Sequence, residues 1–184
     1  MELHGYGVTL RQLTEDKLEL VRRWRNDPKI QQYMSYREHI TPEMQRAWFQ
    51  RINNKHNFYF IIVYQDREIG LINIRDIDYE NKCGEPGIFV WDDEFLDSDV
   101  PMRASLCLGS LIWDQLKLEY LTIHVLRSNK RAIDYNLLLG FKRLPNQDHL
   151  ELQEYRLTRQ ESKNPSKKLL AIIKILQKSA PSLT

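Results

Sequence analysis

The stretch from Glu119 to Phe141 places an asparagine where one repeating pattern gives way to another. Before that point apolar and polar residues alternate, as is typical of a β-strand; the apolar positions are Leu121, Ile123 and Val125. After it, the apolar residues at positions 133, 137, 138 and 141 follow helical spacing, and Gly140 stands where a helix-ending glycine belongs. Asn129 would therefore lie at a helix N-terminus, whose N–H groups and partial positive charge suit a phosphate or an acyl carrier. An ordinary strand-to-helix turn with an asparagine cap explains the same pattern equally well.

The two cysteines offer no comparable chemistry, because Cys83 and Cys107 have neither metal-ligand spacing nor a redox motif. Cys107 lies in an apolar helical run and is expected to be a small core residue. There is no apolar run of about 18 residues and no signal-peptide pattern at the start. We therefore expect a cytoplasmic protein with no metal, no disulfide and no membrane span.

Strand patterns recur along the chain and would build the sheet around this junction. Phe58–Tyr64 is almost continuously apolar, which favours cover on both faces, and Gln65-Asp66-Arg67 predicts a hairpin turn into the next strand. A looser stretch from Asp76 to Cys83 follows. The remaining predicted strands are Val8–Leu13, Ile69–Ile74, Gly87–Trp91 and Leu150–Thr158, the last with Leu150, Leu152, Tyr155 and Leu157 as its apolar positions.

Three helices are predicted between these strands. The first is capped by Thr14 and ends before Pro28; Leu18, Val21 and Trp24 fall on one side, with Arg25 as a further candidate. Thr41-Pro42 opens the second, with Met44, Trp48, Phe49 and Ile52 as its apolar stripe, and the third runs from about Pro101 to Leu116. The order predicts a mixed sheet with helices on both faces, α/β or α+β in class.

The last residues form a separate basic segment. Residues 163–184 carry five lysines and no acid, so that a chain of net charge +2 has −3 on its other residues. A mildly acidic body argues against a nucleic-acid-binding protein. Asn164-Pro165-Ser166 predicts the start of a helix whose broad apolar face comprises Leu169, Leu170, Ile172, Ile173, Ile175 and Leu176. This helix would pack on its own domain or on a second copy in a homodimer; a membrane surface is the alternative.

Residues from about 6 to 160 resemble the GCN5-related N-acetyltransferase (GNAT) superfamily. Asn129-Lys130-Arg131-Ala132-Ile133 followed by Gly140-Phe141 is the most specific motif. The others are Val8–Leu13, Trp24-Arg25-Asn26-Asp27-Pro28, Ile69-Gly70-Leu71-Ile72 and Gly87-Ile88-Phe89-Val90. The Trp24–Pro28 motif is similar to the branch with ribosomal-protein N-terminal and nucleotide-sugar amine acetyltransferases. The resemblance divides the chain into a GNAT-like domain, residues 1–160, and a C-terminal extension, residues 161–184.

The resemblance implies an acetyl transfer from acetyl-CoA to a primary amine, of a sugar nucleotide, a protein N-terminus or a small metabolite. Strands Gly87–Trp91 and Leu121–Leu126 would splay apart in the sheet, and backbone groups of Ile88, Phe89 and Val90 would pair with the pantetheine arm. The pyrophosphate would lie at the N-terminus of the next helix, which assigns it to Val100, Met102, Arg103 and Ala104. Asn129 and Ala132 would also bind the cofactor.

The resemblance further implies the catalytic groups. Glu85 stands just before the expected splayed strand, at the position of the family's frequent general base; a solvated loop carboxylate is the alternative. Asn129 would orient the cofactor or a catalytic water. The acid that protonates the leaving thiolate is commonly a tyrosine seven residues after that asparagine, but Asn136 occupies this position, and Tyr135 is the nearest candidate.

A second departure from the family concerns the phosphate loop. Asp97 and Asp99 stand at its two glycine positions, and carboxylates there would repel a diphosphate. Arg103 could compensate, although a solvated surface arginine is the expectation. This departure leaves open a second interpretation, a GNAT-fold binding or regulatory protein with impaired acetyl-CoA binding. A third is a scaffold that self-associates through the tail helix.

By the same resemblance the amine would bind near the loop between the first two helices, residues 29–40. Tyr33, Tyr36 and Arg37 would suit stacking on a nucleotide base and pairing with its phosphates. A solvated loop is the alternative.

Overall fold

The structure, a computed structural model, describes residues 1–34 and 36–179, without the side chains of Lys174 and residues 176–179. The chain divides into two compact units, residues 1–118 and the residues from 119 onward, and each is described by itself. Both are built of antiparallel strands and helices, which confirms the mixed α/β class. The predicted boundary between residues 160 and 161 stays a prediction.

The first unit contains an antiparallel sheet in which every strand pairs with its neighbour in sequence. The strands are β1 (Glu2–Gly5), β2 (Val8–Gln12), β3 (Phe58–Tyr64), β4 (Arg67–Asp78) and β5 (Cys83–Val90). The hairpin between β3 and β4 is confirmed: Gln65 and Asp66 have φ angles of 49° and 59°, the left-handed conformation that a tight hairpin turn requires. β1 was not expected from the sequence.

Strands β4 and β5 are longer than predicted. The stretch interpreted as loose belongs to them, because β4 runs to Asp78 and β5 begins at Cys83 rather than at Gly87. An irregularity in the register between Arg75 and Asp78 accommodates the polar residues that obscured the strand pattern. Glu85 therefore lies inside a strand, opposite Arg75, and the alternative of a loop carboxylate was wrong.

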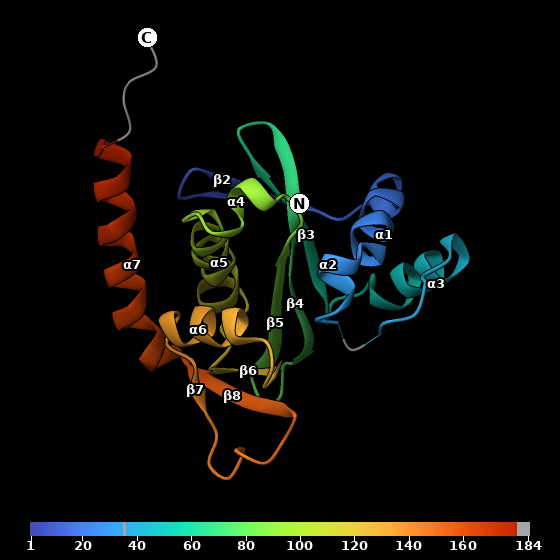
Figure 1. The fold of residues 1–184 in the computed structure, drawn as a ribbon. Helices are drawn as coiled ribbons and strands as arrows, with labels where there is room; N and C mark the ends of the chain where they lie inside the picture. Colours follow the sequence, from blue (N-terminus) through green and yellow to red (C-terminus); the bar gives the residue numbers. More distant parts are fainter. Residues whose placement is uncertain (35, 180–184) are drawn as a thin grey trace. The chain divides into compact units, whose positions relative to one another are not determined.

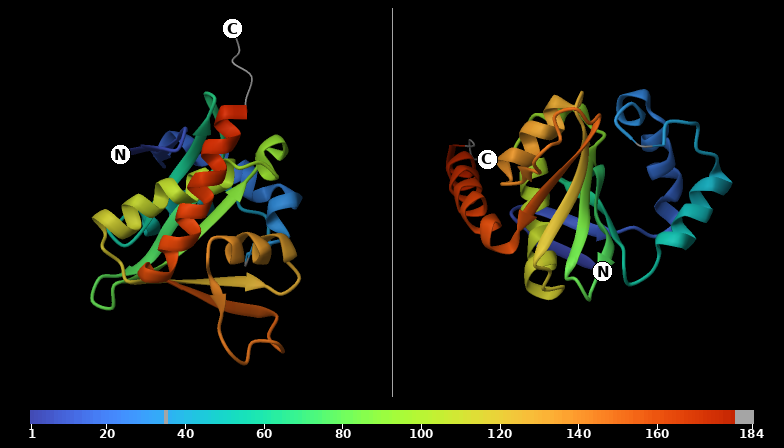
Figure 2. Two further views of the ribbon diagram at one scale, coloured as in Figure 1. Left: turned by 90° about the vertical axis from the view of Figure 1, so that its left-hand side faces the viewer. Right: turned by 90° about the horizontal axis from the view of Figure 1, so that it is seen from below.

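Helices cover both faces of this sheet. Figure 1 shows α1 (Leu18–Asn26) and α3 (Pro42–Ile52) on one side of β3–β5 and α5 (Val100–Ser110) on the other, and the right-hand view of Figure 2 shows the same layers from below. The core under α1 comprises Leu13, Leu18, Val21, Trp24, Ile61 and Leu71, with Trp48, Phe49 and Phe89 among the residues packed against it. The predicted apolar side of α1 is thus confirmed.

The two predicted threonine caps have different outcomes. Thr41 Oγ1 accepts a hydrogen bond from the Met44 N–H at 3.2 Å and caps α3 as expected. Thr14 makes no such bond; it precedes a 3₁₀ turn, η1 (Glu15–Lys17), before α1 begins. The stripe of α3 is also shifted, since Met44 is 38% exposed while the neighbouring Gln45 is 1% exposed.

The remaining helices of this unit are short or change type. α2 (Pro28–Gln31) follows α1 directly, and α4 (Asp93–Leu96) lies between β5 and α5. The predicted helix to Leu116 ends as an α-helix at Ser110 and continues as a π-helical turn, η2 (Leu111–Gln115). Cys107 is a free, buried core thiol as expected, and burial raises its pKa to about 11.

The second unit contains three strands and two helices. β6 (Tyr120–Leu126) and β7 (Lys142–Arg143) each pair antiparallel with β8 (Leu152–Thr158). Leu121, Ile123 and Val125 are buried, which confirms the alternation in β6. In β8 the buried positions are Gln153, Tyr155 and Leu157, whereas Leu150 and Leu152 are exposed, so the predicted apolar set was half wrong.

The helices of this unit also differ from the prediction. α6 (Lys130–Leu138) ends before Gly140, which has the expected positive φ of 98°, but Leu137 and Leu138 are exposed rather than inward. α7 runs through Arg159–Ser179, so Pro165 lies inside it.

Of the predicted apolar face of α7, Leu169 and Ile173 are buried and Ile172 and Ile175 are exposed; the Leu176 side chain lies outside the described residues. Within the part of the chain that the structure describes, no helix could span a membrane.

Candidate active site

A row of polar residues crosses the sheet face that α1 and α3 cover. Tyr59 on β3 is the register partner of Asn73 on β4, which in turn is the partner of Gly87 on β5. Two residue pairs further along, and therefore on the same face, Arg75 lies opposite Glu85. Gly87 lets the asparagine lie flat on the neighbouring strand, since a Cβ there would come within 2.9 Å of Asn73 Oδ1. The first unit thus brings polar groups together beside its apolar core.

Glu85 is held by an arginine on the neighbouring strand. Arg75 Nη2 donates to Glu85 Oε1 at 2.7 Å, and the Glu85 side chain is 20% exposed. Burial opposes the charge on Arg75, but the carboxylate outweighs it, so the pKa of Arg75 lies above its ordinary value. The candidate base is therefore a positioned, partly buried carboxylate in an antiparallel strand.

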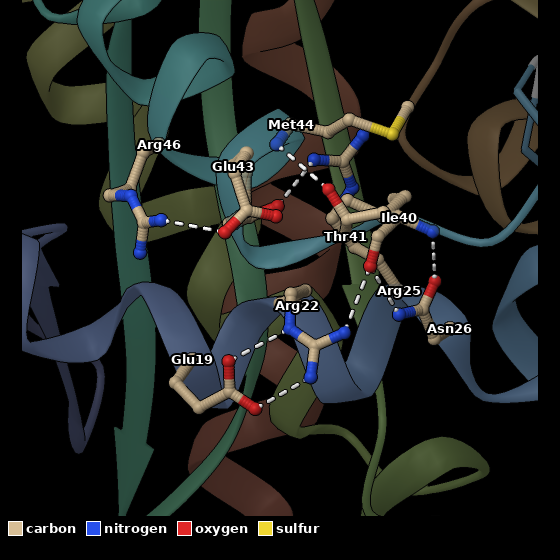
Figure 3. Close-up of polar contacts among 10 residues, drawn as sticks. Glu19, Arg22, Arg25, Asn26, Ile40, Thr41, Glu43, Met44 and Arg46 are labelled. Carbon is tan, nitrogen blue, oxygen red and sulfur yellow. Dashed lines mark hydrogen bonds and ion pairs between the residues drawn. The ribbon is translucent and has the colours of Figure 1, made fainter.

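The loop that joins α2 to α3 is fastened to α1 at its far end (Figure 3). Asn26 Oδ1 accepts from the Ile40 N–H at 2.8 Å, and Asn26 Nδ2 donates to the Ile40 carbonyl oxygen at 2.9 Å. The same oxygen accepts from Arg22 Nη1 at 2.9 Å, and Glu19 holds Arg22 in place. These contacts explain the asparagine of the Trp24–Pro28 motif.

Asp27 of that motif makes two other hydrogen bonds. One carboxylate oxygen accepts from the Lys29 N–H and begins α2, while the other accepts from Trp91 Nε1 at 3.0 Å. It therefore ties the end of α1 to the end of β5.

The three predicted substrate residues lie in this loop and face largely outward. Tyr33 is 52% and Tyr36 is 40% exposed. Tyr36 donates to Glu38 Oε2 at 3.3 Å, and Arg37 Nε donates to the Met34 carbonyl oxygen at 3.2 Å. Contact with a substrate by these side chains stays a prediction.

An open groove of about 1000 Å³ runs beside α1. Arg23, His39 and Trp91 are among its lining residues. Arg67, also in the lining, is already paired with Asp92 and Glu94. Part of the charge that lines this groove is thus neutralised by ion pairs within the protein.

The N-terminus of α5 differs from a simple phosphate cradle. Arg103 is 6% exposed, and its Nε and Nη2 both donate to Asp99 Oδ2, at 2.9 and 2.6 Å. Its Nη1 donates to the Tyr6 carbonyl oxygen at 3.1 Å. The expectation of a solvated Arg103 was therefore wrong: the guanidinium neutralises Asp99 inside the protein.

Few backbone donors remain at this helix start. The Val100 N–H donates to Ser98 Oγ at 3.2 Å, and Pro101 has no N–H. Asp97 and Asp99 have φ angles of −102° and −81°, so neither position needs the conformational freedom of glycine. The role in cofactor binding assigned to Val100, Met102 and Ala104 stays a prediction.

Strand β5 lies close against β4. Ile88, Phe89 and Val90 pair with Ile72, Leu71 and Gly70 of β4. Gly70 has to be glycine for this approach, because a Cβ there would come within 2.3 Å of the Phe89 carbonyl oxygen. The Ile69–Ile72 motif therefore has a structural reason, and the role of β5 in binding pantetheine stays a prediction.

The second unit contains the other predicted site residues. Asn129 Oδ1 accepts from the Ala132 N–H at 3.1 Å, so the asparagine caps α6 and occupies that donor. Asn136 Nδ2 donates to the Ala132 carbonyl oxygen at 2.7 Å, back onto its own helix. Tyr135 lies in the middle of α6, and its role as an acid stays a prediction.

The sequence did not reveal three polar side chains of the first unit, Arg25 on α1, Gln45 on α3 and Asn73 on β4. Arg25 Nη1 donates to Gln45 Oε1 at 3.0 Å, and its guanidinium lies over the Trp48 ring, 4.7 Å from the centroid. The Nε2 of Gln45 and the Nδ2 of Asn73 are buried without a hydrogen-bond partner among the residues that the structure describes. Only the placement of Arg25 near the apolar side of α1 hinted at this cluster.

Comparison with known proteins gives one family match. Residues 8–142 match the family model described as an acetyltransferase (GNAT) domain. No curated protein matches the chain.

Solved structures share the fold at low sequence identity. Apo FdhC, a nucleotide-linked sugar GNAT, has a TM-score of 0.75 and 20% identity over 94% of this chain and 98% of its own. Spermidine N-acetyltransferase from Vibrio cholerae, in complex with CoA and spermine, has a TM-score of 0.70 and 18% identity over 86% of this chain and 99% of its own. A domain from Methanocaldococcus jannaschii DSM 2661 has a TM-score of 0.70 and 20% identity over 82% of this chain and 97% of its own.

Proposed function

The chain belongs to the GNAT acetyltransferase family and is an acyl-CoA N-acyltransferase, and we propose that it moves an acetyl group from acetyl-CoA to a primary amine by direct attack. The acceptor is an amine of a small metabolite, a sugar nucleotide or a protein N-terminus. A spermidine N-acetyltransferase and a nucleotide-linked sugar GNAT are among the similar structures, which supports small amines as the first acceptors to test.

The observation that carries this proposal is the position of Glu85. Its carboxylate lies on the sheet face that α1 and α3 cover, partly buried and held by Arg75. An amine is protonated near neutral pH and has to lose a proton before it can attack an acyl group, so the reaction needs a positioned base. Glu85 would take that proton, directly or through one water molecule.

The acyl-CoA supplies an acyl group activated as a thioester. Backbone groups of Ile88, Phe89 and Val90 would hold its pantetheine arm, with Asn129 and Ala132 also in contact with it. The pyrophosphate fits the start of α5 less well, since the Val100 N–H is taken by Ser98 and Pro101 has none. We therefore assign no step of the reaction to this helix start. Tyr135 would be the acid for the leaving thiolate.

The test is acetyl transfer by the full chain, measured as free CoA released and as acetylated product by mass spectrometry. Acceptors would include spermidine, an amino-sugar nucleotide, free amino acids and a peptide with a free N-terminus. Glu85→Gln should lower kcat/KM by about 10²- to 10⁴-fold, the usual range for loss of a general base, with little change in acetyl-CoA affinity.

Glu80→Gln is the matched control, because this exposed carboxylate lies in the turn between β4 and β5. Full activity in Glu85→Gln would remove Glu85 from the mechanism. Absence of both transfer and acetyl-CoA binding in the unmodified chain would contradict the proposed function.

A further inference from the structure

The Arg25 cluster, defined as Arg25, Gln45, Trp48, Tyr59 and Asn73, contains a cation without a matching anion. All five residues belong to the first unit. Among residues 1–34 and 36–179, Arg25 is paired with no carboxylate; its contacts are the Gln45 amide oxygen and the Trp48 ring. Burial lowers the pKa of Arg25 from its ordinary value, as expected where desolvation is not balanced by a negative charge. An arginine nevertheless stays charged in a protein, so the cluster keeps one positive charge.

The orientation of Gln45 leaves a second donor in this cluster unused. Arg25 can only donate, so the oxygen of the Gln45 amide must face it and the nitrogen must face elsewhere. Gln45 is 1% exposed, and its Nε2 has no hydrogen-bond partner among the described residues. A buried N–H group without an acceptor destabilises the protein, so its presence on α3 calls for a reason.

Asn73 provides the third donor group. Its side chain lies against Gly87, and its buried Nδ2 has no partner in the part of the chain that the structure describes. Tyr59 links it to the other members: the tyrosine is the register partner of Asn73, and its ring packs edge-on against Trp48 with centroids 5.1 Å apart. Contacts through Trp48 and Tyr59 therefore connect the unused donors on α3 and β4 with the unbalanced guanidinium on α1.

A ligand that matches these hydrogen-bond donors has to carry a negative charge and several hydrogen-bond acceptor atoms. We propose that Arg25, Gln45 and Asn73 bind a carboxylate of the acceptor, so that the amine substrate is an amino acid or another amine that bears a carboxylate. This inference rests on the proposed function, because it concerns the acceptor of that reaction.

The net charge of the cluster distinguishes a carboxylate from other groups that accept hydrogen bonds. The nearby Arg75 is already neutralised by Glu85, which leaves Arg25 as the charge within the cluster that has to be matched; Arg51, on α3, adds positive potential at Arg25. A carboxylate carries one negative charge, whereas a phosphate group carries up to two and is usually met by more cations. A polyamine such as spermidine would bring further positive charge next to Arg25 and is disfavoured.

The position of the cluster suits this assignment. Asn73 and Gly87 lie two residue pairs along the sheet from Arg75 and Glu85, on the same face and about 7 Å away in a strand. A carboxylate bound at the cluster would place an amine of the same small molecule toward the proposed base. The acceptor carboxylate would thus act as the anchor that orients the attacking nitrogen.

The first experiment measures binding without transfer. Trp48 lies under Arg25, so a carboxylate at Arg25 should change the tryptophan fluorescence of the full chain. The probes are N-acetylalanine and N-acetylphenylalanine, compared with their carboxamides, which lack the negative charge. We expect saturable responses to the two acids in the millimolar range and much weaker ones to the amides. Trp48→Phe should remove most of the signal.

Variants then test each donor. Arg25→Gln should weaken binding of the acids by about 10- to 100-fold, because it removes a charge-assisted contact, and should leave the amides unchanged. Arg46→Gln, an exposed arginine on α3, is the matched control and should bind as the unmodified chain does. Arg25→Lys keeps the positive charge but lacks the planar guanidinium. Its affinity for the acids should lie between that of Arg25→Gln and that of the unmodified chain.

Asn73→Leu separates a binding role from a structural one. Replacing an amide that has a buried, unpaired donor with an apolar side chain should raise the melting temperature while it weakens binding of the acids. If Asn73 has only a structural role, Asn73→Leu should lower the melting temperature or leave it unchanged, and binding of the acids should not change.

Several outcomes would overturn the inference. They are equal responses to acids and amides, no response to either, or a response that survives Arg25→Gln. Acetyl transfer to spermidine but not to amino acids would also overturn it and leave the proposed function intact. Conversely, selective binding of acids with neither acetyl transfer nor acetyl-CoA binding would support the carboxylate subsite and contradict the proposed function.

Discussion

The Asn26 side chain binds both the N–H and the carbonyl oxygen of Ile40, as a neighbouring strand would, although α2 and the loop after it separate the two residues in the chain. The loop carries Tyr33, Tyr36 and Arg37, so the end of α1 determines where this loop returns to the domain. The Trp24–Pro28 motif thus positions the loop that is predicted to bind the amine substrate.

Replacing Asn26 with Asp tests this role. The change keeps the acceptor for the Ile40 N–H but places a carboxylate oxygen against the Ile40 carbonyl oxygen, where a donor was. We expect a loss of about 1–3 kcal/mol in the free energy of unfolding, as for a buried hydrogen bond that is broken. We also expect a higher KM for the amine with a smaller change in kcat. Chemical denaturation and steady-state kinetics check the two effects. Asn53→Asp, at the exposed end of α3, is the control and should leave KM for the amine unchanged.

The Asp99–Arg103 ion pair should contribute strongly to folding because both side chains are largely buried, with exposures of 14% and 7%. Asp99→Asn would leave the guanidinium in the protein interior without its counter-charge, which typically costs about 3–5 kcal/mol. The matched change Asp93→Asn breaks an exposed pair with Lys29 and should cost about 1 kcal/mol or less. Urea denaturation of both variants checks the difference. Equal losses would show that Asp99 does not act through a buried charge.

Gly70→Ala should destabilise the first sheet. The added methyl group would meet the Phe89 carbonyl oxygen at 2.3 Å, and since this atom belongs to the backbone, β4 and β5 would have to separate. We expect a loss of roughly 1–3 kcal/mol or more. Gly109→Ala is the control: its methyl group would meet Trp113 at an ordinary 3.6 Å, and alanine favours the helix by about 0.5–1 kcal/mol. Opposite shifts in melting temperature are expected, and a stable Gly70→Ala variant would contradict the close approach.

Glu161 gives a testable dependence of stability on pH. Hydrogen bonds from Lys142 and from Thr158 lower its pKa from 4.5 to about 2. A carboxyl group whose pKa is lowered by folding stabilises the protein above its unfolded pKa, and this contribution is lost as the pH falls toward its folded pKa. Glu161→Gln should therefore lower the melting temperature at pH 7 and lose that difference between about pH 4.5 and 2. Glu151→Gln, an exposed glutamate, is the control. A difference that persists at pH 2 would contradict this account.

Much of the fold could be predicted because local patterns agreed with the final structure. The hairpin at Gln65-Asp66, the Thr41 cap and the Asn129 cap follow from residue types at neighbouring positions. The extension of β5 was missed because Cys83–Pro86 lacks apolar alternation and depends on pairing with β4.

The site was less predictable for a physical reason. Arg25, Gln45 and Asn73 come from three separate elements, and nothing near each of them in sequence signals the others. Their importance depends on which hydrogen bonds are left unmade, and that becomes visible only after packing. Glu85 was predicted by resemblance and stays a prediction as a site residue, whereas its ion-pair partner Arg75 was not predicted.

The connectivity of the first sheet has a consequence for the order in which it folds. β3, β4 and β5 follow one another with short turns, so they can pair with little loss of chain entropy. β2 has to find β3 across the whole segment that forms α1, α2 and α3, a far longer loop to close. We therefore expect the β3–β5 meander, which carries Tyr59, Asn73 and Glu85, to form early. Docking of α1 would come later and bring Arg25 to a surface that is already in place.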